Sequence, residues 1–295
     1  MASKFVSTPT IPSFLLLDPL LKAWLVEDIG RGDRVTEALL SQLRLGQESR
    51  SKEARWVAKE AGVIAGLPIA ARVFQLLDPA VRFESWASEG ETVKAGQSIA
   101  ALHGPFDALL SGERVALNVG MRLSGIASAT RKFVEILEPY PTCFADTRKT
   151  TPGLRILEKY ASKVGGAVNH RMGLDDAAMI KDNHIAAAGG IAQAIALVRA
   201  HAPYPLTIEV ETESLDQVRD ALVHGADIIM LDNMKPEMMT EAVKMIRATS
   251  DRIKIEASGN VTLETLQSIA ETGVDYISSS APMTRSTWMD ISMRF

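Results

Sequence analysis

The sequence predicts an α/β protein in which a small α+β domain precedes a barrel of alternating strands and helices. Seven short apolar segments in the second half of the chain each end in charged or hydroxyl residues, and helical patterns separate them. Residues 51–104 instead show short strands broken by glycines. With 295 residues, 46% of them hydrophobic, the chain can bury a core for one large or two modest domains.

The composition excludes several classes of protein. Net charge is -4, pI is about 5.8 and mean hydropathy is +0.06, so nothing global favours binding to nucleic acid or an anionic membrane. The single cysteine, Cys143, excludes a disulfide framework, fits a reducing compartment, and is interpreted as a small buried residue. An apolar run at residues 14–17 is too short for a signal sequence or a membrane span. We expect a cytoplasmic protein.

The first domain is predicted element by element from its periodicity. A helix is expected first, and an acidic, glycine-containing loop follows at residues 27–33. Short strands and one further helix come next, and glycines break two more strands after residue 90. The expected helices are residues 12–26 and 68–77, and the expected strands include 54–58, 62–66 and 81–86.

Residues 111–138 have apolar spacings that suit one or two long helices, with Ser111 as the expected N-cap. Prolines at 139 and 141 end this stretch, and the barrel region follows. The predicted domains are residues 1–125 and 126–284. The tail, 285–295, alternates like a strand, and we expect it to return to the first domain's sheet.

The seven apolar segments are interpreted as buried strands of the barrel. A complete barrel of this type has eight units. Either one strand is missed or the barrel is incomplete, and the helical stretch before it could cover the gap. The segments are residues 143–149, 167–171, 178–184, 206–211, 228–233, 253–259 and 276–280.

The carboxyl ends of such strands meet at one mouth, where barrel enzymes carry their chemistry. Here that mouth is expected to be basic, with two carboxylates opposite. Arginine offers a planar fork for carboxylate or phosphate, and lysine a mobile charge. The pattern predicts a site for a small, highly anionic substrate. Its basic residues are Arg148, Lys149, Arg171 and Lys181 with His170 and His184, and its carboxylates are Glu211 and Asp232.

Glu209 and Glu211 share one face of their strand, because side chains alternate with period two. Glu211 is expected to reach the mouth, and Glu209 to lie one layer deeper, paired to a lysine. Glu211 and Asp232 could hold Mg²⁺ or ribose hydroxyls, or stabilise a positive transition state. A zinc site at His170 and His184 is disfavoured because no third ligand stands at a useful spacing.

Two serine-containing segments end the last strands, at Ser258-Gly259 and at Ser279-Ser280. Loops at this position in barrels often bind phosphate through backbone N–H groups and a short helix N-terminus. Arg114 begins a predicted helix outside the barrel, and periodicity alone predicts that it is exposed.

Taken in order, these motifs resemble the quinolinate phosphoribosyltransferase family over nearly the whole chain. The resemblance implies a type II phosphoribosyltransferase fold, with an N-terminal sandwich and a seven-stranded incomplete barrel. It also implies a homodimer in which Arg114 enters the neighbouring active site. The motifs are residues 27–33, 111–118, 146–150, 169–171, 180–184, 209–211 and 231–233.

The resemblance also implies the reaction and the residue roles. Quinolinate and phosphoribosyl pyrophosphate would give nicotinate mononucleotide, pyrophosphate and CO₂, with Mg²⁺, in de novo NAD synthesis. Many relatives carry glycine where this chain has Asn260 and Ser280. The implied carboxylate ligands are Arg114, Arg148, His170 and Arg171; Lys149 and Lys181 would bridge the acid and the pyrophosphate, and Glu211 and Asp232 would lie near the ribose.

Three other functions compete with this one. Lys181 at a strand end could be the nucleophile of a Schiff-base aldolase. The molybdenum-linked paralogues of the family share its fold. Residues 89–97 resemble part of a lipoyl or biotinyl carrier domain, but the lysine beside methionine that such domains modify is absent there.

Overall fold

The computed structural model describes residues 9–43 and 51–295, which divide into two compact units. One, the amino-terminal unit, comprises the described residues up to Ala129 together with Ile156–Gly165 and Ser286–Phe295. The other, the parallel-sheet unit, comprises Thr130–Arg155 and Gly166–Arg285. The expected boundary at residues 125 and 126 remains a prediction. None of the described helices combines the length and apolar character needed to span a bilayer.

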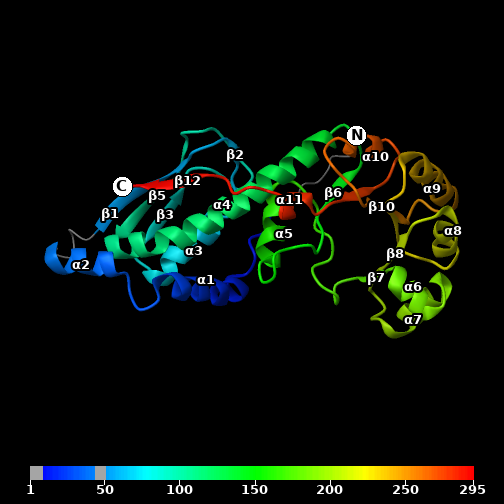
Figure 1. Ribbon diagram of the computed structural model, residues 1–295, viewed down its shortest axis with the longest axis horizontal. Coiled ribbons are helices and arrows are strands. Elements are labelled where there is room, and N and C mark those ends of the chain that lie inside the picture. The colour runs from blue at the N-terminus through cyan, green and yellow to red at the C-terminus, as the bar shows by residue number, and fades with distance from the viewer. Residues whose placement is uncertain (1–8, 44–50) are drawn as a thin grey trace. The chain divides into compact units, whose positions relative to one another are not determined.

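The amino-terminal unit is built on a sheet of order β12-β1-β5-β3, beside a β2-β4 pair (Figure 1). The chain's last strand pairs antiparallel with β1, so that Ile291 lies opposite Ala58. Trp56 on β1 is fully buried and meets Phe74 and Phe83 edge-on. The strands are β1 (Ser51–Ala58), β2 (Gly62–Val63), β3 (Arg82–Ser85), β4 (Thr92–Val93), β5 (Ser98–Pro105) and β12 (Ile291–Arg294).

Most helices of this unit follow the sequence prediction, but α2 (Arg34–Leu43) was not predicted, and two other helices differ in detail. The first helix continues through residues 27–29, which were expected to be loop. Ser111 is not an N-cap, because a single helix begins five residues earlier and the Ser111 hydroxyl donates to Asp33 at 3.1 Å. The helices are α1 (Phe14–Ile29), α2 (Arg34–Leu43), α3 (Leu67–Leu77), α4 (Phe106–Ile136), which continues into the parallel-sheet unit, and α5 (Arg155–Val164).

The segment that resembles a carrier domain has a structural explanation in this unit. The Glu89 carboxylate accepts hydrogen bonds from the N–H groups of Gly66 and Leu67, at the start of α3. A carboxylate at a helix N-terminus satisfies donors that have no partner within the helix. Only residues 92–93 of the segment form a strand, β4, within the described chain.

The second unit contains a parallel sheet of order β6-β11-β10-β9-β8-β7. Residues 167–171, predicted as a strand, form only a bridge from Val168 to Ala145. Among the described residues, no pairing joins β7 to this segment, so the sheet does not close into a full barrel. The strands are β6 (Cys143–Ala145), β7 (Ala178–Ile180), β8 (Ile208–Thr212), β9 (Ile228–Asp232), β10 (Lys254–Ser258) and β11 (Tyr276–Ser278).

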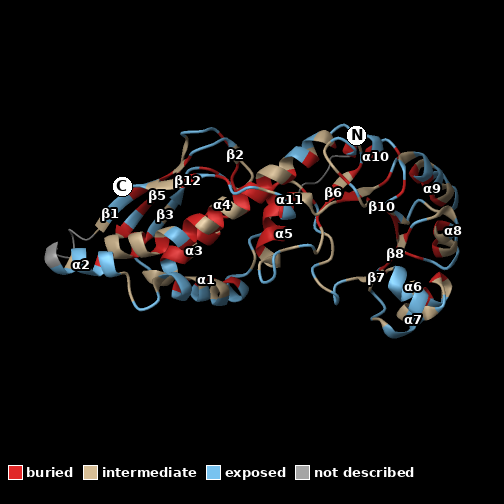
Figure 2. Ribbon diagram, viewed as in Figure 1, coloured by how far each residue is buried: buried red, intermediate tan, exposed pale blue. Residues whose placement is uncertain are grey.

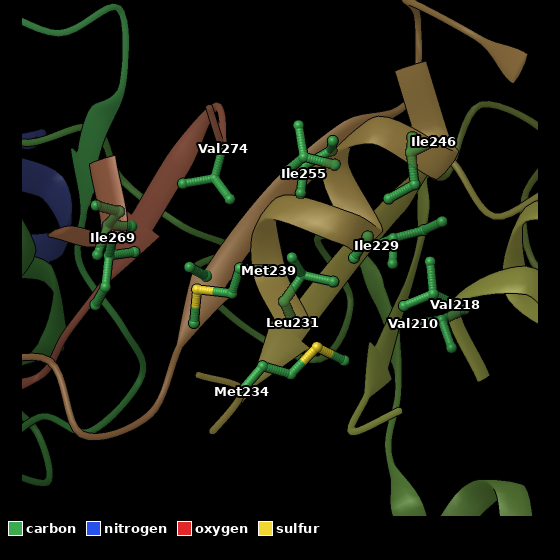
Figure 3. Packing of buried hydrophobic residues seen from close by; sticks show 14 of the residues in the cluster. Val210, Val218, Ile229, Leu231, Met234, Met239, Ile246, Ile255, Ile269 and Val274 are labelled. Atoms are coloured by element: carbon green, nitrogen blue, oxygen red, sulfur yellow. The ribbon is translucent and has the colours of Figure 1, made fainter. Parts of the chain in front are cut away.

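Helices cover one face of this sheet, and strand residues of one parity pack against them (Figures 2 and 3). Val210, Ile229 and Ile255 belong to this core, with Val218 from α8 and Ile246 from α9. Residues of the opposite parity therefore point to the other face, where the polar groups collect. The helices are α6 (Asp182–Ala188), α7 (Ile191–His201), α8 (Leu215–Val223), α9 (Pro236–Thr249), α10 (Leu266–Ala270) and α11 (Ala281–Thr284).

Candidate active site

The face opposite the helices carries a layer of polar residues at the carboxyl ends of the strands. Lys181 follows β7, Glu211 lies near the end of β8, and Asp232 and Ser258 end β9 and β10. The register aligns β9 with β10 so that Asp232 lies directly opposite Ser258. Alternation along each strand thus places these side chains on one face and at one edge.

Lys181 and Glu211 form an ion pair across neighbouring strands. The Lys181 ammonium donates to both oxygens of the Glu211 carboxylate, at 2.9 and 3.2 Å. Its engagement as a donor argues against the free amine nucleophile that a Schiff-base aldolase needs. Lys149, by contrast, is exposed in the loop after β6, and no partner of its ammonium is found within the described chain.

Arg148 and Arg171 lie close enough for the charge of one to act on the other. Burial lowers the pKa of Arg171, and the charge of Arg148 lowers it further. Arg171 donates to the carbonyl oxygen of Ala177 at 2.8 Å, whereas the buried Nε of Arg148 has no partner among the described residues. A buried donor without a partner is costly, so this pair is suited to an anion that satisfies both guanidinium groups.

The pKa of Asp232 is affected by the second carboxylate of the site, that of Glu211. Burial raises the pKa of Asp232, and the charge of Glu211 adds to the rise, whereas Lys181 lowers it. The Asn233 amide donates to the Asp232 carboxylate at 2.7 Å. Two carboxylates that repel one another, with oxygen ligands available, fit a magnesium ion that is held mainly by a substrate's phosphates.

The loops after β10 and β11 are defined by unusual backbone angles and local hydrogen bonds. Gly259 and Asn260 both have positive φ, at 87° and 51°, and Asn260 donates to the Asn233 side chain at 3.0 Å. Ser280 precedes the short helix α11, and the Ser279 hydroxyl accepts from the N–H of Ala281 at 3.2 Å. The short helix expected after the last strand is therefore present.

Below this layer lies a group of ionisable residues that the sequence did not reveal as one unit. His170 Nε2 lies 3.2 Å from Glu209 and 3.5 Å from Glu256. The prediction that Glu209 pairs with a lysine was wrong, because His170, from the bridge segment (residues 167–171), occupies that place. Glu256 was not predicted as a site residue. Its position between Ile255 and Ala257 in a buried strand is the sequence signal that could have indicated it.

The remaining predicted residues lie apart from this cluster. His184 is exposed in α6, where its Nδ1 accepts from the N–H of Lys181 at 3.0 Å. The described group able to hold a metal contains His170, Glu209 and Glu256, and not His184. Arg114 is exposed on α4 in the amino-terminal unit.

Comparison with known proteins identifies what this chain is similar to. Two family models match it: "Quinolinate phosphoribosyl transferase, N-terminal domain" over residues 33–124, and the corresponding C-terminal domain over residues 126–294. A probable nicotinate-nucleotide pyrophosphorylase (carboxylating) of Synechocystis sp. is 58% identical over 284 residues, which cover 96% of this chain and 94% of that protein. The Bacillus subtilis protein of the same name is 46% identical, with 95% and 93% covered.

Solved structures agree with the sequence relatives. The crystal structure of NadC from Streptococcus pyogenes matches with a TM-score of 0.90 at 41% identity, and covers 97% of this chain and 98% of that one. A nicotinate-nucleotide pyrophosphorylase from Francisella tularensis matches with a TM-score of 0.88 at 35% identity, with 98% and 99% covered.

Proposed function

The chain belongs to the quinolinate phosphoribosyltransferase family, and we propose that the ends of its parallel strands form the active site. The chain is a decarboxylating quinolinate phosphoribosyltransferase, an enzyme of NAD biosynthesis. It transfers phosphoribosyl to quinolinate and releases pyrophosphate and CO₂. The observation that best supports this site is the partly buried pair Arg148 and Arg171, in which the Arg148 charge acts on Arg171 and the buried Arg148 Nε has no partner among the described residues.

The charges of the site suit these reactants. Quinolinate carries two carboxylates, which Arg148 and Arg171 would bind, together with Arg114 from a second copy of the chain in a homodimer. Lys149 and Lys181 would lie between the acid and the departing pyrophosphate. Fixed positive charge stabilises the anions that develop during transfer, because it needs no reorganisation at the moment of reaction.

Glu211 and Asp232 would lie beside the ribose. There they orient its hydroxyls and stabilise the oxocarbenium character that develops as pyrophosphate leaves. With the pyrophosphate they would also hold Mg²⁺, which neutralises phosphate charge when bound. Once the ring nitrogen carries the ribosyl group, the pyridinium withdraws electrons and the neighbouring carboxylate leaves as CO₂. The electron pair that remains on the ring carbon then takes up a proton, which gives nicotinate mononucleotide.

The 5′-phosphate of the sugar would bind at the loops after β10 and β11. Gly259 allows close approach of the backbone, and Ser258, Ser279 and Ser280 offer hydroxyl groups. Asn260 has a left-handed backbone conformation, and its side chain donates to that of Asn233. We further propose a cytoplasmic location, which the single cysteine supports.

The test is release of labelled CO₂ from quinolinate labelled at its 2-carboxylate. The purified chain should release CO₂ only when phosphoribosyl pyrophosphate and Mg²⁺ are present, and Lys181→Ala should abolish the release with the fold intact. Nicotinate, which lacks the 2-carboxylate, serves as the control acceptor. CO₂ release without the sugar donor, or near-normal turnover in Lys181→Ala, would refute the assignment.

A further inference from the structure

The roles proposed above leave Glu209 and Glu256 unexplained. Both are glutamates within strands, β8 and β10, and their side chains are only 2% and 6% exposed. Each approaches the same atom, Nε2 of His170, whose side chain is 12% exposed. Burial of two carboxylates side by side is expensive unless a partner compensates them.

The His170 ring has a defined tautomer in this arrangement. Its Nδ1 accepts a hydrogen bond from the backbone N–H of Arg171 at 2.7 Å, so Nδ1 carries no proton. The ring proton is therefore on Nε2, and it points toward Glu209 and Glu256. Both ring nitrogens are directed into the protein, which leaves neither to contact a substrate carboxylate.

The surroundings of Glu256 favour the protonated form of its carboxyl group. Burial raises the pKa of Glu256 to about 7, the nearby charges of Glu209 and Asp146 add to the rise, and His170 and Ser278 oppose it. Burial lowers the pKa of Arg171, and the charge of Glu209 nearby partly offsets this effect. Arg171 therefore lies near the negative charge of Glu209 whether or not a substrate is bound.

The segment that carries Arg171 depends on such contacts because it is not a regular strand. Beyond the bridge at Val168, Asp146 accepts from the His170 N–H at 2.8 Å and from the Asn169 amide at 2.6 Å. The imidazole then links Arg171 to β8 and β10. Side chains therefore provide the anchorage that a ladder of backbone hydrogen bonds provides elsewhere in the sheet.

We propose that Glu209 and Glu256 are positioning residues, which act through His170 to hold the Arg171 backbone and so direct its guanidinium at the acid substrate. His170 itself acts on the substrate only through Arg171. This inference rests on the proposed function, since it concerns residues that support the same active site. It differs from the role implied by resemblance, in which His170 binds the carboxylates directly.

The kinetic test compares Glu256→Gln and Glu209→Gln with the wild type. Each should raise KM for quinolinate by about tenfold to a hundredfold, because a buried contact that holds the His170 ring is weakened. KM for phosphoribosyl pyrophosphate should change little, because its ligands lie in the layer above. The matched control is Glu158→Gln, which removes a carboxylate that is 1% exposed and bonded to Arg122 at 2.7 Å in the amino-terminal unit. An unchanged quinolinate KM in both variants would overturn the proposal.

The second test does not depend on variants of Glu209 and Glu256 or on catalytic turnover. The chain has five histidines, so ¹⁵N-histidine labelling with His170→Gln for assignment isolates the His170 ring signals. In the wild type we expect the Nε2–H tautomer, and we expect it to persist when quinolinate is added. An Nδ1–H tautomer, or a change of protonation on binding quinolinate, would overturn the inference. A wild type that turns over no quinolinate would instead refute the proposed function and leave the tautomer result standing.

Discussion

Arg148 and Arg171 illustrate how single residues prepare the site for an anion. Arg171 has a backbone acceptor in Ala177 and negative charge from Glu209 nearby. Arg148 has a buried Nε without a partner among the described residues. We therefore expect different tasks for the two cations: the protein itself supports Arg171, whereas Arg148 keeps a donor available for the substrate.

Glu256 gives a prediction about stability and pH. Its pKa is raised from 4.5 to about 7, so between these values the folded state keeps a proton that the unfolded chain has released. Stability therefore falls as pH rises through this window, by an amount on the order of a few kcal/mol. In Glu256→Gln this contribution is absent, and urea denaturation at pH 5 and pH 7 should show a smaller fall. The control Asp216→Asn, which removes an exposed carboxylate on α8, should follow the wild type; equal falls in Glu256→Gln and wild type would contradict the prediction.

At the scale of elements, the loop after β10 depends on backbone conformations that few residues adopt. Gly259 has a φ of 87°, and a β-carbon there would clash with the Asn233 side chain and lie 2.9 Å from the Asn233 nitrogen. Asn233 and Asn260 themselves have φ values of 54° and 51°. Asn233 therefore joins the end of β9 to the loop that follows β10.

Gly259→Ala should therefore disturb the proposed 5′-phosphate site. The left-handed strain and the clash together should raise KM for phosphoribosyl pyrophosphate about tenfold or more. Gly225→Ala is the matched control, because Gly225 has a φ of 81° but open space around the added carbon. Steady-state kinetics with saturating quinolinate would separate the two. Equal effects in both variants would show that strain alone, and not the loop's contact with Asn233, is responsible.

Much of this architecture could be predicted from local patterns. The apolar segments after residue 143 marked the strands, and their polar ends marked the edge that carries Lys181, Glu211 and Asp232. The bridge segment was predicted as a full strand, because its apolar start gives no sign that side chains replace its ladder. The start of α4 was misplaced because Ser111 is a good N-cap that instead donates to Asp33.

Contacts between side chains that are distant in the sequence could not be predicted. Glu209 was expected to meet a lysine, and the structure brings His170 to it from a segment 39 positions earlier. No period or motif in the sequence encodes that encounter. It depends on how β6, β8 and β10 are ordered in the sheet, with β11 and β9 between them.

At the scale of the whole molecule, the proposed homodimer makes a prediction about subunit mixing. Arg114→Ala and Arg148→Ala should each be inactive alone. If Arg114 enters the neighbouring site, mixed dimers regain one intact site, and random mixing should restore roughly a quarter of the wild-type activity. Unfolding and refolding the two variants together, then assaying CO₂ release, measures this. A mixture as inactive as its components would show that Arg114 acts within its own chain or not at all.

The central claim is that cations from strand ends distant in sequence converge to bind a small diacid. Calorimetric titration of quinolinate into the wild type and into Arg148→Ala tests it most directly, with Arg219→Ala, an exposed arginine on α8, as the control. We predict that Arg148→Ala loses quinolinate affinity by about a hundredfold, and that Arg219→Ala binds like the wild type. Equal affinity in Arg148→Ala and wild type would contradict the account.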